Sequence, residues 1–331
     1  MVFSVAFDLD STLGYFESIH PYLMVFFPDL LQYVYKAPHY TGRPFPKLSI
    51  IHDDKKRLAK AFDNFVLFMA RKEHINKLLR PGILDIIKLL LAAKQKGIVG
   101  GIMIYSSNSN PYMLLFASKL IQILLGLKEE IFCPLVHWWH PLRDEEVRKP
   151  GTLLHLGHGP KTVDTIINAL MSRECRASTT GKIIPKNILF FDDIIHQDIY
   201  DNIPSANYFH VERYIHYGNQ HVIYSCFLYS LMKNNIDIDK NLLKEFNKIG
   251  LYIGPDNSNI ASFTNRVPTG TNRDIGDTDT ILRRLNLLLD ITMSRPIKRN
   301  NSTKSTIISV GGKRKTRKKT RMVYKILACL D

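Results

Sequence analysis

The chain has 331 residues, of which 45% are hydrophobic, so it is long and apolar enough to form one large core or two modest domains. Its formal charge of +15 favours a negatively charged partner, such as nucleic acid, an anionic surface or a phosphorylated substrate. Seven basic residues lie within 313–321, and the remainder of the chain is therefore only moderately basic.

The cysteines and the apolar runs exclude several classes of protein. The four cysteines form no C-x-x-C pair, which argues against a disulfide framework or a thiolate zinc site and favours a reducing compartment. No basic region precedes the first apolar stretch, so the N-terminus does not resemble a signal peptide. The apolar runs fall short of the ~20 residues that a membrane-spanning helix needs. We therefore expect an intracellular protein, cytoplasmic or nuclear, that is neither secreted nor embedded in a membrane.

Five short apolar runs predict the strands of a parallel sheet. In chain order they are Val2–Phe7, Ile98–Tyr105, Ile131–Val136, Ile188–Phe191 and Tyr208–Val211. Three of them end in polar residues: Asp8 and Asp10 follow the first run, Ser106 follows the second, and Asp192 follows the fourth. Since the carboxyl ends of parallel strands meet at one edge of a sheet, these side chains are expected to share a site.

Amphipathic segments between the strands predict helices. They are Lys55–Met69, a helix that begins at Pro81-Gly82 and ends near Lys96-Gly97, Tyr112–Leu125, Lys161–Met171, Gln220–Lys233 and Ile281–Ile291. The alternation of strands and helices favours an α/β fold with a doubly wound parallel sheet.

Changes in composition divide the chain into three parts. Residues 1–235 are expected to form the core, with a helical insertion at about 15–78. Residues 236–297 have weak periodicity and form a poorly defined extension. Residues 298–331 are polar and basic and are expected to be largely disordered.

The residues at the first strand end fit phosphoryl transfer. Asp8 can attack phosphorus as a carboxylate nucleophile, and Asp10 can protonate the leaving oxygen and later activate water. Clustered carboxylates repel a phosphate, so this chemistry requires a hard cation, most plausibly Mg²⁺. It also requires a lysine that neutralises the transferring oxygens.

The motifs and their order resemble those of the haloacid dehalogenase-like superfamily. They are an apolar strand with Asp8-x-Asp10-x-Thr12, an apolar strand with Ser106, a helix led by lysine, and an apolar strand with Asp192-Asp193. The loop Phe-Asp-Leu-Asp-x-Thr-Leu and the turn Tyr-Ser-Ser are similar to those of the phosphatases that act on the RNA polymerase II C-terminal domain. The resemblance implies a Rossmann-like core and a small helical cap, formed here by the insertion at about 15–78.

The resemblance also implies roles for individual residues. Asp8 is the expected nucleophile, and Asp10 is the expected acid and base, with its carbonyl facing Mg²⁺. Thr12 is expected to brace the loop, and Ser106, with Ser107 beside it, to bind a phosphoryl oxygen. Asp193 is expected to complete the Mg²⁺ shell, while Asp192 orients the lysine or a metal-bound water, although which of these two touches the metal stays open.

Two lysines suit the third motif. Lys161 begins the helix directly before the fourth strand, whereas Lys149 lies farther back in the chain. Position along the chain favours Lys161 and leaves Lys149 as the alternative.

Several histidines have spacings that fit metal ligands. They are His137 with His140, and His155 with His158. We expect these residues to be solvated or to assist substrate binding rather than to hold zinc. His196, three residues beyond Asp193, is expected to be an ordinary surface histidine, and the alternative is that it lines the mouth of the site.

The substrate is not defined by the motifs. We expect a Mg²⁺-dependent phosphatase that acts on a phosphoprotein, a nucleotide or a nucleic-acid end. The alternative is an inactive module with the same fold that binds nucleic acid through the basic run 313–321. That run also fits a nuclear-import signal, and it is similar to tails on proteins of large DNA viruses.

Overall fold

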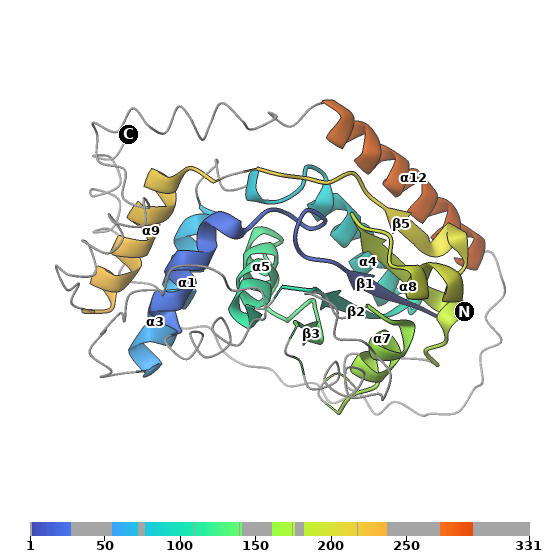
Figure 1. Ribbon diagram of the computed structural model, residues 1–331, viewed down its shortest axis with the longest axis horizontal. Helices are drawn as coiled ribbons and strands as arrows, with labels where there is room; N and C mark the ends of the chain where they lie inside the picture. Colours follow the sequence, from blue (N-terminus) through green and yellow to red (C-terminus); the bar gives the residue numbers. More distant parts are fainter. Residues whose placement is uncertain are drawn as a thin grey trace, which may run out of the picture. The chain divides into compact units, whose positions relative to one another are not determined.

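Five parallel strands form a single sheet in the computed structural model (Figure 1). The strands are β1 (Phe3–Phe7), β2 (Val99–Tyr105), β3 (Leu135–Val136), β4 (Ile188–Asp192) and β5 (Tyr208–His210). Their order is β3-β2-β1-β4-β5, which places β1 at the centre of the sheet. Phe7 pairs in register with Ile104 of β2 and with Phe191 of β4, so the carboxyl ends of these three strands lie level.

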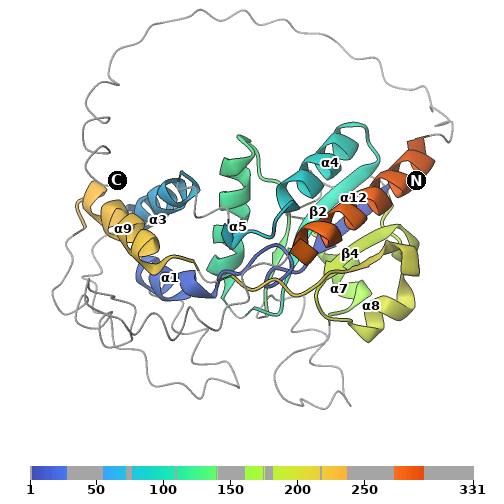
Figure 2. The ribbon, with the colours of Figure 1, turned by 90° about the horizontal axis from the view of Figure 1, so that it is seen from above.

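Helices cover both faces of the sheet because successive side chains of a strand point to opposite sides. Val5 and Phe7 of β1 belong to the core cluster that α4 (Ile83–Gln95) and α5 (Pro111–Leu124) complete. Ala6 belongs to the second cluster, which includes residues of α7 (Val163–Leu170) and α8 (Gln197–Asn202). Figure 2 shows α4 on one side of the strands and α7 with α8 on the other. The predicted α/β fold with a parallel sheet is confirmed, and the arrangement is consistent with a Rossmann-like core.

The described residues all belong to one compact unit, Met1–Ser294. The structure describes residues 2–27, 55–71, 77–108, 110–138, 140, 161–173, 175, 182–216, 218–236 and 272–293. Among these residues, no helix combines the length and the apolar character that crossing a membrane requires. The basic run 313–321 lies outside the described residues.

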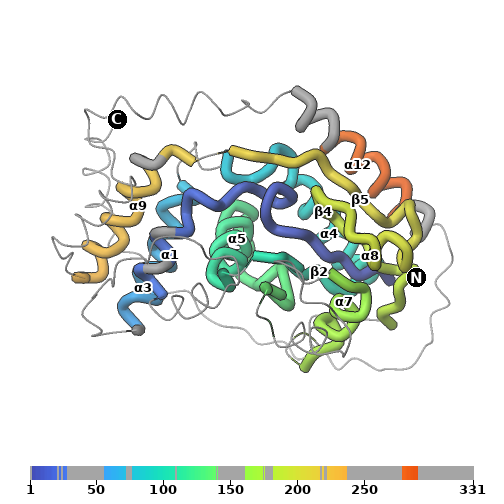
Figure 3. The backbone as a smooth tube through the Cα atoms, viewed as in Figure 1, coloured from blue at the N-terminus to red at the C-terminus, as the bar shows by residue number. Residues whose placement is uncertain are grey.

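A helical group is built from segments that lie far apart in the sequence. It contains α1 (His20–Phe26), α3 (Lys55–Ala70) and α9 (Gln220–Lys233), which lie together in Figures 1 and 3, and α3 packs against both α9 and α5. Phenylalanine rings fill its centre, and Phe65 lies 5.3 Å from Phe26 and 5.8 Å from Phe116 between ring centroids. The described part of the insertion therefore packs with helices of the core region, and a cap that closes over a site stays a prediction.

The C-terminal helix α12 (Asn272–Met293) packs against α4. Gly82, before α4, has a φ of 75° and meets the side chain of Thr278, so a larger residue there would collide with α12. The Thr278 hydroxyl donates a hydrogen bond of 2.7 Å to the carbonyl of Pro81. Arg284 donates to the carbonyl of Tyr208 and lies 4.6 Å from the ring centroid of Phe209. The predicted helix Ile281–Ile291 thus lies mostly in the C-terminal half of a longer helix, α12, that packs with the fold.

Two expectations about the region of β3 are wrong. The strand predicted over 131–136 is limited to Leu135–Val136, since Pro134 has no N–H to donate to a ladder. Cys133 and Cys175 form a disulfide, although the cysteine spacing had argued against one. The two residues are 42 positions apart and the fold brings their Cα atoms to 5.5 Å, a proximity that spacing alone does not reveal.

Removing this disulfide is expected to lower stability. The double variant Cys133→Ser/Cys175→Ser should lose about 2–4 kcal/mol in its free energy of unfolding, since the covalent link restricts the unfolded chain. Urea titrations with and without reductant measure the effect, and reductant should lower the wild type to the value of the variant. The variant serves as the control, because reductant should not change its stability. A wild type whose stability is also unaffected by reductant would contradict the prediction.

Candidate active site

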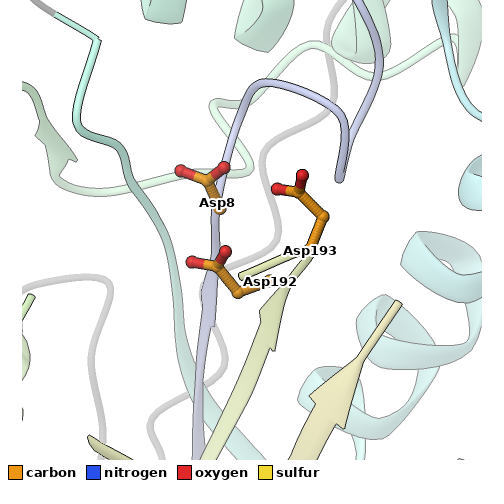
Figure 4. A group of neighbouring side chains, drawn as sticks. All are labelled: Asp8, Asp192 and Asp193. Atoms are coloured by element: carbon orange, nitrogen blue, oxygen red, sulfur yellow. The ribbon is translucent and has the colours of Figure 1, made fainter. Parts of the chain in front are cut away.

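Three aspartates meet at the carboxyl ends of the two central strands. Asp8 directly follows β1, and its backbone N–H donates a hydrogen bond of 2.8 Å to the carbonyl of Phe191 in β4. Asp192 ends β4, and Asp193 follows it. Carboxylate oxygens of these three residues lie within 4.8 Å of one another, and Figure 4 shows them gathered at the strand ends. The structure thus brings three of the predicted residues together at the strand ends.

Lys161 joins two of these aspartates. Its Nζ lies 2.6 Å from Oδ1 of Asp8 and 2.5 Å from Oδ2 of Asp192. The lysine side chain is 2% exposed, so both ion pairs are buried. Position along the chain had favoured Lys161 over Lys149, and Lys149 lies outside the described residues.

The start of α7 places Lys161. Thr162 is the N-cap of this helix, and its Oγ1 accepts a hydrogen bond of 3.2 Å from the N–H of Thr165. The N–H of Thr162 donates to the hydroxyl of Tyr105, at the end of β2. The cap from Thr162 to Thr165 defines where the helix begins, and the hydrogen bond from Thr162 to Tyr105 attaches this end of the helix to β2. Lys161, the residue before the cap, therefore lies at the strand ends.

Burial and neighbouring charges shift the pKa values of the three aspartates. Burial raises the pKa of Asp8 above the ordinary carboxyl range, and Asp192 adds to this effect, while Lys161 opposes it. Burial also raises the pKa of Asp193. Although burial acts in the same direction on Asp192, the ammonium of Lys161 holds the pKa of that carboxyl below its usual value. Burial therefore disfavours the ionised forms of Asp8 and Asp193, and the cations that oppose it are the buried Lys161 and, 4.0 Å from Asp193, the exposed Arg213.

The loop after β4 folds around the carboxylate of Asp192, and Tyr208 supports that loop. Oδ1 of Asp192 accepts a hydrogen bond of 2.8 Å from the N–H of Ile194, and its Oδ2 lies 3.2 Å from Nε2 of His196. The hydroxyl of Tyr208 in β5 donates to the carbonyl of Ile194 and accepts from the N–H of His196. His196 therefore contacts a site aspartate, because the loop after β4 turns back over the strand end, and this contact fits the alternative of a place at the site rather than the expected ordinary surface position.

Asp10 lies beside the segment that links β2 to α5. Its Oδ2 accepts a hydrogen bond of 2.8 Å from Nδ2 of Asn108, and the N–H of Asn108 donates to Oγ of Ser106. Burial raises the pKa of Asp10 to about 6, although the hydrogen bond from Asn108 lowers it. A carboxyl with a pKa near neutrality is suited to give and to take a proton. Sequence reasoning did not select Asn108, because nothing in a polar run of serines and asparagines indicates which member reaches Asp10.

The loop that carries Asp8 and Asp10 is braced by a buried arginine. Arg80 donates from Nε to the carbonyl of Thr12 at 3.0 Å and from Nη2 to the carbonyl of Ser11 at 2.7 Å. It also donates to the carbonyl of Glu212. Ser11 has a φ of 62°, a left-handed conformation that is uncommon for residues other than glycine, and these contacts hold it there.

The remaining predicted residues have weaker links to the site. Within the described part of the chain, Oγ1 of Thr12 and Oγ of Ser107 are buried without a hydrogen-bond partner. His137 and His140 lie near each other, with ring centroids 5.8 Å apart, but the three aspartates are the group of possible metal ligands that the described residues form. His155 and His158 lie outside the described residues. The predicted roles of Thr12, Ser106 and Ser107 toward a phosphate stay predictions.

Comparisons of the chain with protein-family models, with curated proteins and with solved structures found no match. The site geometry and the sequence motifs therefore carry the functional inference. Asp8 is a buried carboxyl group that can act as a nucleophile, and Asp10 is a second one that can transfer a proton. The carboxyl oxygens of Asp8, Asp192 and Asp193 are suited to a hard cation.

Replacing Lys161 with methionine is expected to destabilise the protein. The Lys161→Met variant should lose about 3–5 kcal/mol of unfolding free energy at pH 7.5, because Asp8 and Asp192 would stay buried without their counter-charge. Urea denaturation measures the loss. The matched control is Lys88→Met, which breaks an exposed ion pair with Asp85 and should cost less than about 1 kcal/mol. Equal losses in the two variants would contradict a buried charge cluster.

The raised pKa of Asp10 predicts a pH dependence of stability. The native carboxyl keeps its proton up to a pH of about 6, whereas the unfolded carboxyl loses it near 3.8. The native state therefore binds more protons across this window, and its stability falls as pH rises through it. Asp10→Asn removes this titration and should flatten the decline between pH 4 and pH 7 by about 1–2 kcal/mol. Urea titrations in chelator measure both slopes, and identical slopes would show that Asp10 does not titrate in this way.

Proposed function

We propose that this chain is a Mg²⁺-dependent phosphatase of the haloacid dehalogenase-like kind, which hydrolyses phosphomonoesters through a phosphorylated Asp8. The observation that carries the proposal is the buried ammonium of Lys161 between Asp8 and Asp192, with Asp193 beside them. A lysine in this place fits a site that must bind a phosphoryl group next to a carboxylate nucleophile.

The donor set fits magnesium. Asp8 and Asp193, with the backbone carbonyl of Asp10, would hold the ion, and Asp192 would support it, since all of these donors are the hard oxygen ligands that Mg²⁺ prefers. Burial disfavours the ionised forms of Asp8 and Asp193, which gives a physical reason for a divalent cation. When bound, the ion would neutralise charge on the carboxylates and on the phosphoryl oxygens.

In the first half of the reaction, Asp8 is phosphorylated. A carboxylate oxygen of Asp8 forms a bond to phosphorus while the bond from phosphorus to the ester oxygen breaks. The carboxyl of Asp10 gives its proton to that leaving oxygen, so the product is a neutral alcohol and Asp10 becomes a carboxylate. Lys161 keeps the nucleophile in place and places positive charge near the transferring oxygens.

In the second half, water releases the phosphate. Asp10, now ionised, takes a proton from a water molecule, and the water oxygen forms a bond to phosphorus. The bond between phosphorus and Asp8 breaks, which returns both aspartates to their starting states. Ser106 and Ser107 are proposed to hold phosphoryl oxygens, and Thr12 is proposed to brace the loop.

The substrate class is proposed from the motifs. The loop similarity to phosphatases of the RNA polymerase II C-terminal domain favours a phosphoprotein, and the basic run 313–321 extends the candidates to nucleotides and nucleic-acid ends. A module that binds nucleic acid without catalysis is the alternative, and it predicts no hydrolysis of any phosphomonoester.

Asp8→Asn is expected to abolish phosphatase activity. Hydrolysis of p-nitrophenyl phosphate with saturating Mg²⁺ should fall below about a thousandth of the wild-type rate, because the amide cannot attack phosphorus. Release of p-nitrophenolate measures the rate, and binding of beryllium fluoride should be lost in parallel.

The matched control is Asp85→Asn, which changes an exposed aspartate on α4 and should keep full activity. Full activity of Asp8→Asn would refute the mechanism. A wild type with no Mg²⁺-dependent hydrolysis, combined with nucleic-acid binding that depends on residues 313–321, would favour the alternative.

A further inference from the structure

We propose that Asn108 is a positioning residue, which fixes the carboxyl group of Asp10 so that one chosen oxygen delivers the proton to the leaving group. The inference rests on the proposed function, since it concerns the acid of the same reaction. It starts from the hydrogen bond of 2.8 Å that Nδ2 of Asn108 donates to Oδ2 of Asp10.

The orientation of the Asn108 amide is set by its other partner. Oδ1 of Asn108 accepts a hydrogen bond of 2.8 Å from the backbone N–H of Asn110. A backbone N–H can only donate, so the amide oxygen must face Asn110 and the amide NH₂ must face Asp10. The hydrogen bond with Asn110 therefore determines that Asn108 presents a donor to Asp10. A flipped amide would lose both hydrogen bonds.

The backbone of Asn108 is also anchored on both sides. Its N–H donates to Oγ of Ser106 at 3.1 Å, and its carbonyl accepts from the N–H of Trp138 at 2.9 Å. Asn110 is fully buried and caps α5, since its Oδ1 accepts from the N–H groups of Tyr112 and Met113. Asn108 is thus joined through its side chain to the N-cap of α5 and through its backbone carbonyl to Trp138, after β3.

A fixed donor makes the two oxygens of Asp10 different. Oδ2 already accepts the N–H of Asn108, so it is the poorer position for the acidic proton. The proton is directed to Oδ1, and the same oxygen takes a proton from water in the second half of the reaction. Without Asn108 the carboxyl can rotate, and the productive orientation becomes one of several.

Leaving groups that differ in their need for a proton test this role. The ester oxygen of p-nitrophenyl phosphate departs readily as an anion, whereas that of glycerol 2-phosphate needs the proton of Asp10. In Asn108→Asp, Oδ1 can still accept the N–H of Asn110, but the donor toward Asp10 is replaced by a second carboxylate oxygen. The variant therefore keeps the loop contact, loses the donor and adds a carboxylate beside Asp10, and Asn108→Ala separates the last two effects.

The measured quantity is kcat/KM with saturating Mg²⁺, which reports the steps through phosphorylation of Asp8. For Asn108→Asp we expect a fall of about 10–100-fold with glycerol 2-phosphate, as for partial loss of general acid catalysis, and a fall of about threefold or less with p-nitrophenyl phosphate. Asn108→Ala removes the donor without adding charge and should change the ratio in the same direction by a smaller factor. Asn202→Asp, at an exposed asparagine of α8, is the matched control and should leave the ratio unchanged.

Two outcomes would overturn the inference. If kcat/KM falls by the same factor for both substrates in Asn108→Asp and in Asn108→Ala, or falls for neither, Asn108 does not position the acid. The proposed function still stands in that case, provided that the wild type is active and Asp8→Asn is inactive. A wild type that hydrolyses neither ester would overturn the proposed function and this inference together.

Discussion

The ammonium of Lys161 lies between the carboxylates of Asp8 and Asp192, and the chain brings these three charges together from β1, β4 and the start of α7. None of them is stable in this buried place alone, because an isolated charge loses its hydration there. The two ion pairs hold the start of α7 at the carboxyl ends of β1 and β4. Burial disfavours the ionised forms of Asp8 and Asp193, so a further cation beside them would stabilise those forms.

Much of the sheet could be predicted from the sequence. A strand buried on both faces is a short apolar run, and four of the five strands match such runs with bounds that differ by one residue. The acidic strand ends were predictable for the same reason, since Asp8, Asp192 and Asp193 interrupt apolar stretches abruptly. Lys161 was selected by its place before β4 rather than by any local pattern.

The remaining features depend on contacts between distant segments. The pairing of Cys133 with Cys175 requires the packing of β3 near the end of α7, and cysteine spacing carries no such information. His196 and Asn108 reach the site because their loops turn at particular angles, which composition does not specify. The full extent of α12 was missed because its first turns are polar, and its contacts with Pro81 and Tyr208 stabilise it in the fold.

The contacts of Arg80 have a consequence for the order in which the protein is made. This arginine joins the carbonyls of Ser11 and Thr12 to that of Glu212, which the ribosome adds 132 residues after Arg80 itself. Domains made on the ribosome begin to fold from the N-terminal side, but contacts between distant segments must wait for the later segment. The aspartate loop is among the first parts to emerge and among the last to gain its final support, so a nascent chain that stops before β5 would carry Asp8 and Asp10 without a finished site.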